Sequence, residues 1–129
     1  MFENLNLFRL SSALAAHAGS GQAVVAENIA NADTPGYKAR EVVPFAAVME
    51  AEAAGFHARA TRAGHMMGSG PAMQPGIVRA GDRSSNPNGN EVSLEEEMLK
   101  AVAVKRQHDK ALAIYRSGLT ILRSSLGRG

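Results

Sequence analysis

The chain has 129 residues, with 14 lysines and arginines against 12 aspartates and glutamates, and it has no cysteine. This length predicts one domain, the near balance of charge argues against nucleic-acid binding, and the lack of cysteine excludes disulfides and thiolate metal sites. We expect no transmembrane segment, because no apolar run reaches about 18 residues. We also expect no cleavable signal peptide, because the N-terminus lacks a basic region followed by an apolar one.

The first predicted element is a helix over about residues 5–31. Its apolar residues recur at steps of three, four and seven positions, as on one face of a helix. They are Leu7, Leu10, Leu14, Ala18, Val25 and Ile29. Gly19 and Gly21 in its middle weaken an isolated helix by about 1 kcal/mol each relative to alanine. We therefore expect close packing against another backbone to offset this cost.

A tight turn should follow this helix. Thr34 precedes a proline and so disfavours the α conformation, which predicts a helix end near Asn31. Pro35 and Gly36 suit the two central positions of a type II turn, where glycine supplies a positive φ. Asn28 and Asn31 lie three positions apart, so they share a helix face and could bond to exposed carbonyls or to a neighbouring chain.

The middle of the chain is predicted to be rich in loops. Residues 38–43 should run extended, and Pro44 suits the first position of a short helix that ends at Gly55. Residues 55–90 are rich in glycine and proline and poor in large apolar residues. Residues 84–90 form a strong turn cluster that leads into the last element.

The last predicted element is a long helix over residues 93–126. Ser93 and Glu96 form a capping box at its start. An unbroken heptad pattern runs along it, which predicts a helix-packing seam. The pattern consists of Leu94, Met98, Ala101, Lys105, His108, Leu112, Tyr115, Leu119, Leu122 and Leu126.

A helix of this length spans about 50 Å and needs a partner helix, which the N-terminal segment can supply. The predicted fold is therefore mainly α, with long N- and C-terminal helices paired as a coiled-coil hairpin around a loop-rich middle segment. The residues predicted to form the packing seam of the two helices are Leu7, Leu10, Leu14, Val25, Ile29, Leu94, Met98, Leu112, Tyr115, Leu119, Leu122 and Leu126.

The sequence offers no catalytic residue and no metal site. The four histidines, His17, His57, His65 and His108, lie at no spacing typical of metal ligands. The acidic run 95–97 is interpreted as a charged helix start rather than an acid–base pair. No phosphate-binding or dinucleotide-binding fingerprint occurs, so neither an enzymatic activity nor a cofactor is expected.

Residues 28–40 resemble the signature found near the N-terminus of bacterial flagellar axial proteins. The motif residues are Asn28, Ile29, Ala30, Asn31, Thr34, Pro35, Gly36 and Tyr37. Residues 89–98 are similar to the segment that begins the terminal helix of proximal rod proteins. The resemblance covers both ends of the chain and points to the flagellar basal-body rod protein family.

That resemblance implies a structural subunit of the proximal rod, which polymerises helically and transmits torque from the MS ring toward the hook. It implies export through the flagellar type III apparatus without signal cleavage and a place in the periplasmic part of the basal body. The implied partners are further copies of the chain, other axial rod subunits, the MS ring and its adaptor protein. No nucleic acid is implied. The whole chain would form one rod-subunit domain, with the N-terminal helix over 1–32, the middle over 33–92 and the C-terminal helix over 93–129.

Three alternatives stay open at this point. The other small proximal rod subunit, the C-type, differs mainly in the continuation after the turn. A non-flagellar helical adaptor or export chaperone would form an ordered dimer in isolation. A peptidoglycan-cleaving rod enzyme would need a catalytic domain with paired carboxylates, for which the loop-rich middle leaves little room.

Overall fold

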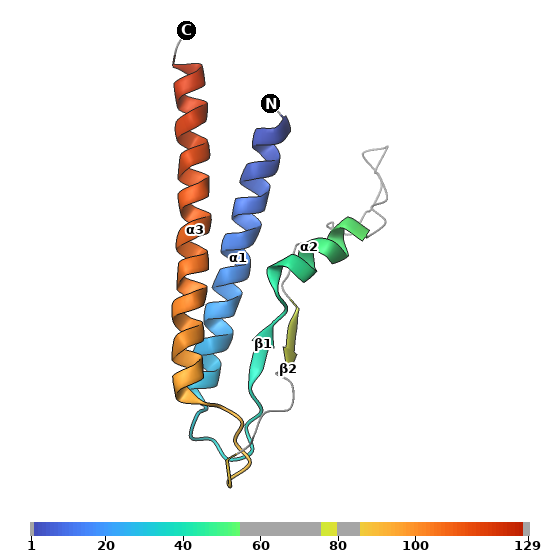
Figure 1. Ribbon diagram of the computed structural model, residues 1–129, viewed down its shortest axis with the longest axis vertical. Coiled ribbons are helices and arrows are strands. Elements are labelled where there is room, and N and C mark those ends of the chain that lie inside the picture. The colour runs from blue at the N-terminus through green and yellow to red at the C-terminus, as the bar shows by residue number, and fades with distance from the viewer. Residues whose placement is uncertain (1, 55–75, 80–85, 128–129) are drawn as a thin grey trace, which may run out of the picture.

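The computed structural model describes residues 2–54, 76–79 and 86–127. In chain order they form helix α1 (Phe2–Ala30), strand β1 (Arg40–Val42), helix α2 (Phe45–Ala54), strand β2 (Ile77–Arg79) and helix α3 (Leu94–Leu126). Helices α1 and α3 pack side by side and run in opposite directions, so both chain ends lie at the same end of the molecule (Figure 1). The predicted mainly helical fold with two paired terminal helices and a loop-rich middle is confirmed.

Local signals set the ends of both long helices. After α1, the backbone N–H of Asn31 donates to the carbonyls of Glu27 and Asn28 at 3.2 and 3.1 Å, which closes the last turn where the sequence predicts it. At the start of α3, the Ser93 hydroxyl accepts a hydrogen bond from the backbone N–H of Glu96 at 3.5 Å. The predicted cap at Ser93 is therefore present.

The segment after the turn forms an arm beside the helix pair (Figure 1). Strand β1 pairs antiparallel with β2, with Glu41 opposite Val78, and helix α2 follows directly after Pro44. The extended segment and the short helix are as predicted. Strand β2 was not predicted, because its pairing joins residues far apart in the sequence. Most of the predicted loop-rich stretch, residues 55–75 and 80–85, lies outside the described residues.

The face that α3 turns toward α1 is a row of residues at seven-residue intervals: Glu97, Val104, Ala111 and Gly118. Small residues on one helix oppose larger ones on the other. A Cβ added to Gly21 would lie 3.1 Å from Val104 Cγ1, and one added to Gly118 would lie 3.1 Å from Phe8 Cε1. Further along the pair, the rings of Phe8 and Tyr115 meet edge to face with centroids 5.1 Å apart. The glycines therefore allow the two backbones to approach closely.

This packing corrects the predicted seam on α3. The seven-residue period is present, but the face that contacts α1 is rotated about a quarter-turn from the line of large apolar residues. Small side chains at the contact let the helices lie closer than leucines would, which is why the other face is used. Of the seam residues, Val25 is buried; Leu7, Leu14, Ile29, Leu119 and Leu122 are half-buried; and Leu10, Leu94, Met98, Leu112, Tyr115 and Leu126 are exposed.

The described helices include none that combines the length and the apolar character needed to cross a bilayer.

The two glycines in the middle of α1 give a matched test of this packing. Gly19 has open space around its Cα, whereas a Cβ on Gly21 meets Val104. Gly19→Ala should stabilise the protein by up to about 1 kcal/mol through helix propensity. Gly21→Ala should forfeit that gain and destabilise by about 1–2 kcal/mol, because the added methyl overpacks the contact. Thermal unfolding followed by circular dichroism would measure both, and equal stabilisation by the two variants would contradict the close approach of the helices.

Candidate functional site

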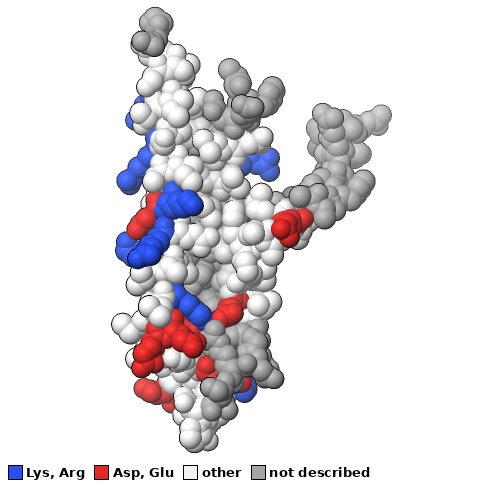
Figure 2. Space-filling view, viewed as in Figure 1, with Lys and Arg blue, Asp and Glu red and all other residues white. Residues whose placement is uncertain are grey.

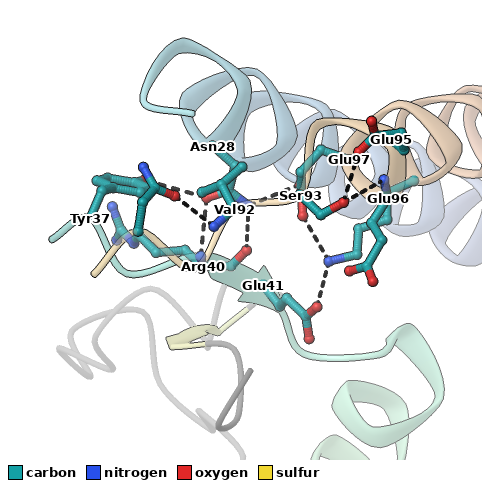
Figure 3. A network of polar contacts seen from close by, with 11 residues as sticks. Asn28, Tyr37, Arg40, Glu41, Val92, Ser93, Glu95, Glu96 and Glu97 are labelled. Carbon is teal, nitrogen blue, oxygen red and sulfur yellow. Dashed lines mark hydrogen bonds and ion pairs between the residues drawn. The ribbon is translucent and has the colours of Figure 1, made fainter. Parts of the chain in front are cut away.

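The residues of the predicted signature gather at the base of the helix pair, where α1 ends and α3 begins. There they form a network of buried and partly buried hydrogen bonds and ion pairs with β1 and with the segment before α3 (Figure 3). We call this set the basal polar cluster. It consists of Asn28, Tyr37, Arg40, Glu41, Asn90, Glu97 and Lys100.

Asn28 is at the centre of the basal polar cluster and is fully buried. Its Nδ2 donates to the Arg40 carbonyl at 2.8 Å and to Glu97 Oε2 at 3.0 Å. Its Oδ1 accepts from the Arg40 backbone N–H at 3.0 Å and from the Tyr37 hydroxyl at 3.3 Å. Both donors and both lone pairs of the amide are therefore used. One side chain thus joins α1, β1 and α3.

Glu97 supplies a carboxylate to the same place, and it is also fully buried. A buried charge is costly unless it is paired and hydrogen-bonded. Lys100 Nζ donates to Glu97 Oε1 at 2.9 Å and to Glu41 Oε1 at 2.6 Å, while Asn28 covers the other oxygen of Glu97. The acidic run at the start of α3 therefore has two roles: Glu95 and Glu96 are exposed, whereas Glu97 binds α1.

A second fully buried asparagine, Asn90, joins the turn after α1 to the segment before α3. Its Nδ2 donates to the carbonyls of Asn31 and Thr34 at 2.9 and 2.7 Å, and its Oδ1 accepts from the Val92 N–H at 2.7 Å. The backbone N–H of Glu91 also donates to the Tyr37 carbonyl at 3.1 Å. The two segments that resemble rod proteins are therefore bonded to each other.

The turn itself has the features predicted for it. Gly36 has a φ of 71°, and the Tyr37 N–H donates to the Thr34 carbonyl at 3.3 Å, as in a type II turn. Gly89, at a φ of 78°, lies against it: a Cβ on Gly89 would be 3.5 Å from the Gly36 Cα. Glycine is required at both positions by the left-handed backbone.

Charged and phenolic groups surround the basal polar cluster. Arg40 pairs with Glu27 at 2.9 Å, and Lys38 pairs with Glu91. Burial, and then the nearby Glu27 carboxylate, raise the pKa of the Tyr37 phenol above its usual value. Tyr37 therefore stays protonated at physiological pH and donates its hydrogen bond to Asn28.

The arrangement is suited to holding helices together, because its side chains bond across the boundaries between α1, β1 and α3. Within residues 2–54, 76–79 and 86–127, no group of three histidine, aspartate or glutamate side chains could hold a metal ion. His57 and His65 lie outside the described residues. Asn28 and Glu97 bond to each other across the helix pair, Asn28 also bonds to Arg40 of β1, and Lys100 bonds to Glu41 of β1, so the cluster fixes how α1, β1 and α3 meet.

Sequence reasoning identified the signature but missed most of its partners. Asn31 and Thr34 contribute backbone carbonyls to the cluster. The Asn31 side chain makes local bonds instead: its Nδ2 donates to the Glu27 carbonyl at 2.8 Å, and its Oδ1 accepts from the Thr34 hydroxyl at 3.2 Å. Asn90, Glu97 and Lys100 were not predicted as partners. A row at seven-residue intervals begins at Glu97 and runs through the small residues of α3. This row is the sequence signal that could have identified Glu97 as a partner of the motif.

Comparison with known proteins places these features in one family. The family model described as "Flagella basal body rod protein" matches residues 10–38. The chain is 36% identical over 117 residues to the flagellar basal body rod protein FlgB of Agrobacterium fabrum (strain C58), covering 88% of this chain and 87% of that protein. It is 39% identical over 77 residues to FlgB of Bacillus subtilis (strain 168), covering 60% of this chain and 59% of that protein.

Two asparagines of one motif provide a matched test of the basal polar cluster. Asn28→Ala leaves the Arg40 backbone and part of the Glu97 carboxylate unpaired in a buried place, so it should destabilise the protein by at least about 3 kcal/mol. Asn31→Ala removes two exposed side-chain hydrogen bonds, to the Glu27 carbonyl and from the Thr34 hydroxyl. It should change stability by less than about 1 kcal/mol, because the groups left behind can bond to water. Urea unfolding would measure both. Similar losses in the two variants would show that Asn28 does not have this central role.

Proposed function

Because the chain belongs to the FlgB family of flagellar basal body rod proteins, we propose that it is a structural subunit of the proximal rod that polymerises helically. In this role it transmits torque from the MS ring toward the hook. The whole chain acts as one rod-subunit domain, with α1 and α3 as its assembling part. Neither the C-type rod subunit nor a non-flagellar adaptor is favoured, since both curated relatives are FlgB proteins.

The observation that supports polymerisation is the part of the apolar seam of α3 that α1 leaves exposed. The face of α3 toward α1 is made by Glu97, Val104, Ala111 and Gly118, and this leaves large apolar residues in water. Met98 is 59% exposed, and Leu94, Leu112 and Leu126 are exposed as well. An exposed apolar line of this length marks a surface that other chains cover. Contacts between unlike faces of identical subunits do not close, so they produce helical filaments.

The remaining partners follow from the place of a proximal rod subunit. The chain contacts other axial rod subunits. At the end nearest the MS ring, it contacts that ring and its adaptor protein. It reaches the periplasmic rod through the flagellar type III export apparatus without loss of a signal peptide. A chain without cysteine suits this route, because no disulfide has to be reduced before the unfolded chain passes a narrow channel.

Exposed seam residues allow assembly to be tested apart from folding. Met98→Asp combined with Leu112→Asp should leave the helicity of the isolated chain unchanged, because both side chains are exposed on α3. The same variant should abolish swimming when it replaces the chromosomal copy, because it places charges in an apolar contact between subunits. The unmodified chain and the variant would each carry a tag, and isolated basal bodies would be probed for it. The unmodified protein should be present and the variant absent. Normal rods built from the variant would contradict the proposed role of the seam.

A further inference from the structure

The turn that precedes α3 contains an asparagine followed by a glycine, Asn88 and Gly89, in the yellow-orange loop at the foot of Figure 1. Of the asparagines in the sequence, Asn88 alone has glycine after it. Glycine has no Cβ, so it does not shield its own backbone nitrogen from the side chain of the residue before it. Asn88 is also exposed, so water reaches its amide. In the amino-acid sequence, this pair is therefore the point most open to deamidation.

Deamidation at such a pair proceeds in two steps. The Gly89 backbone nitrogen gives its proton to water and attacks the Asn88 Cγ, and the side-chain nitrogen leaves as ammonia. The product is a five-membered succinimide ring, which water then opens. If water breaks the bond from the nitrogen to Cγ, an ordinary aspartate remains at position 88. If water breaks the bond to the main-chain carbonyl carbon, the product is isoaspartate, and the main chain then runs through Cβ and Cγ.

In the folded chain, three hydrogen bonds oppose the first step. The Gly89 N–H donates to the Asn86 carbonyl at 2.8 Å, so the proton that must leave is held. The Asn88 Oδ1 accepts from the Asn90 N–H at 3.1 Å, which fixes the side-chain amide. The Asn88 carbonyl accepts from the Gly36 N–H at 3.1 Å, which ties the peptide group to the turn after α1. Both reacting groups are therefore engaged.

The backbone of this turn also places the nitrogen out of line for attack. Pro87 and Asn88 are the central residues of the turn that the Gly89 N–H closes, and Asn88 has a negative φ. These features define a type I turn, in which ψ of the second central residue is about 0°. A ψ near zero aligns the Gly89 nitrogen with the nitrogen of Asn88. Ring closure requires alignment with the Asn88 Cβ instead, so the turn must open before the reaction can occur.

We propose that Asn88 is a deamidation site of the unfolded chain and that the folded turn protects it. The rate in the folded protein is the rate in the unfolded chain multiplied by the fraction of molecules in which the turn is open. Protection therefore measures how firmly this turn is bonded to the rest of the molecule. This chemistry does not depend on the rod-subunit function.

Both products damage the joint between the two motif segments. Isoaspartate adds a methylene to the main chain before Gly89, which displaces Asn90 from the carbonyls of Asn31 and Thr34 that it binds at 2.9 and 2.7 Å. Aspartate adds a negative charge near the base of the molecule, where acidic residues already gather (Figure 2). A chain that is modified while unfolded therefore refolds with a weaker joint.

The natural full-length chain provides the first test. One sample is kept in buffer and one in concentrated guanidinium chloride, at the same mildly alkaline pH and temperature, and circular dichroism verifies that only the first is helical. Mass spectrometry of peptides follows the conversion of each asparagine. In denaturant, Asn88 should react before any other asparagine. In buffer it should react at least about tenfold more slowly, which corresponds to an opening free energy of at least about 1.4 kcal/mol. Equal rates in the two samples, or another asparagine reacting first in denaturant, would overturn the proposal.

Two proline variants test whether the turn itself gives the protection. Pro87→Gly loosens the turn, and Pro44→Gly makes the same exchange at the start of α2. For each variant the rate in buffer is divided by its rate in denaturant, which removes effects on the intrinsic chemistry. Pro87→Gly should raise this ratio about fivefold, because glycine favours open conformations, and Pro44→Gly should change it less than about twofold. An equal rise in both would show that protection comes from global folding and would overturn the assignment to this turn.

Refolded chains test the damage to the joint. The isoaspartate form, separated from the unmodified chain after reaction in denaturant, should unfold at a lower guanidinium concentration. Equal midpoints for the two forms would overturn the predicted weakening.

Discussion

The hydrogen bond between Asn28 and Glu97 is the constraint on which the arrangement of the other elements depends. It joins two fully buried polar groups 69 positions apart, one near the end of α1 and one in the first turn of α3. A shift of α3 by one heptad would place Val104 opposite the amide and leave the carboxylate without this partner. The register of the helix pair is therefore set by polar groups at its base, while glycine and alanine further up only allow the close approach that this register requires.

The signature motif acts as a determinant of the fold, and its residues have distinct physical roles. Asn28 contributes its side chain, Asn31 and Thr34 contribute carbonyls to Asn90, and Gly36 contributes a backbone conformation that other residues rarely adopt. None of these roles involves an exposed reactive group. The exposed apolar line of α3 is separate from the motif, so the residues that define the subunit and those proposed to join subunits lie on different parts of the molecule.

Local features were predictable from the sequence, and contacts between distant segments were not. Ser93 and the Thr34–Pro35 pair determine helix ends through their own neighbours, so the end of α1 and the start of α3 followed from them. The side of α3 that faces α1 depends on the space left at Gly21 and on the bulk of Phe8, which a heptad pattern on α3 does not contain. For the same reason three consecutive glutamates gave no sign that Glu97 alone is buried.

The position of the basal polar cluster has a mechanical consequence. It lies at the closed end of the hairpin, far from both chain ends (Figure 1). A force that pulls the two chain ends apart would peel α1 from α3 one contact at a time, starting at the open end, where Phe8 packs against Tyr115 and Gly118. A force that slides one helix past the other would instead act at the same time on the hydrogen bonds of Asn28 and Glu97 and on the close contacts at the glycines. A subunit built in this way resists shear along its axis far better than peeling at its free end.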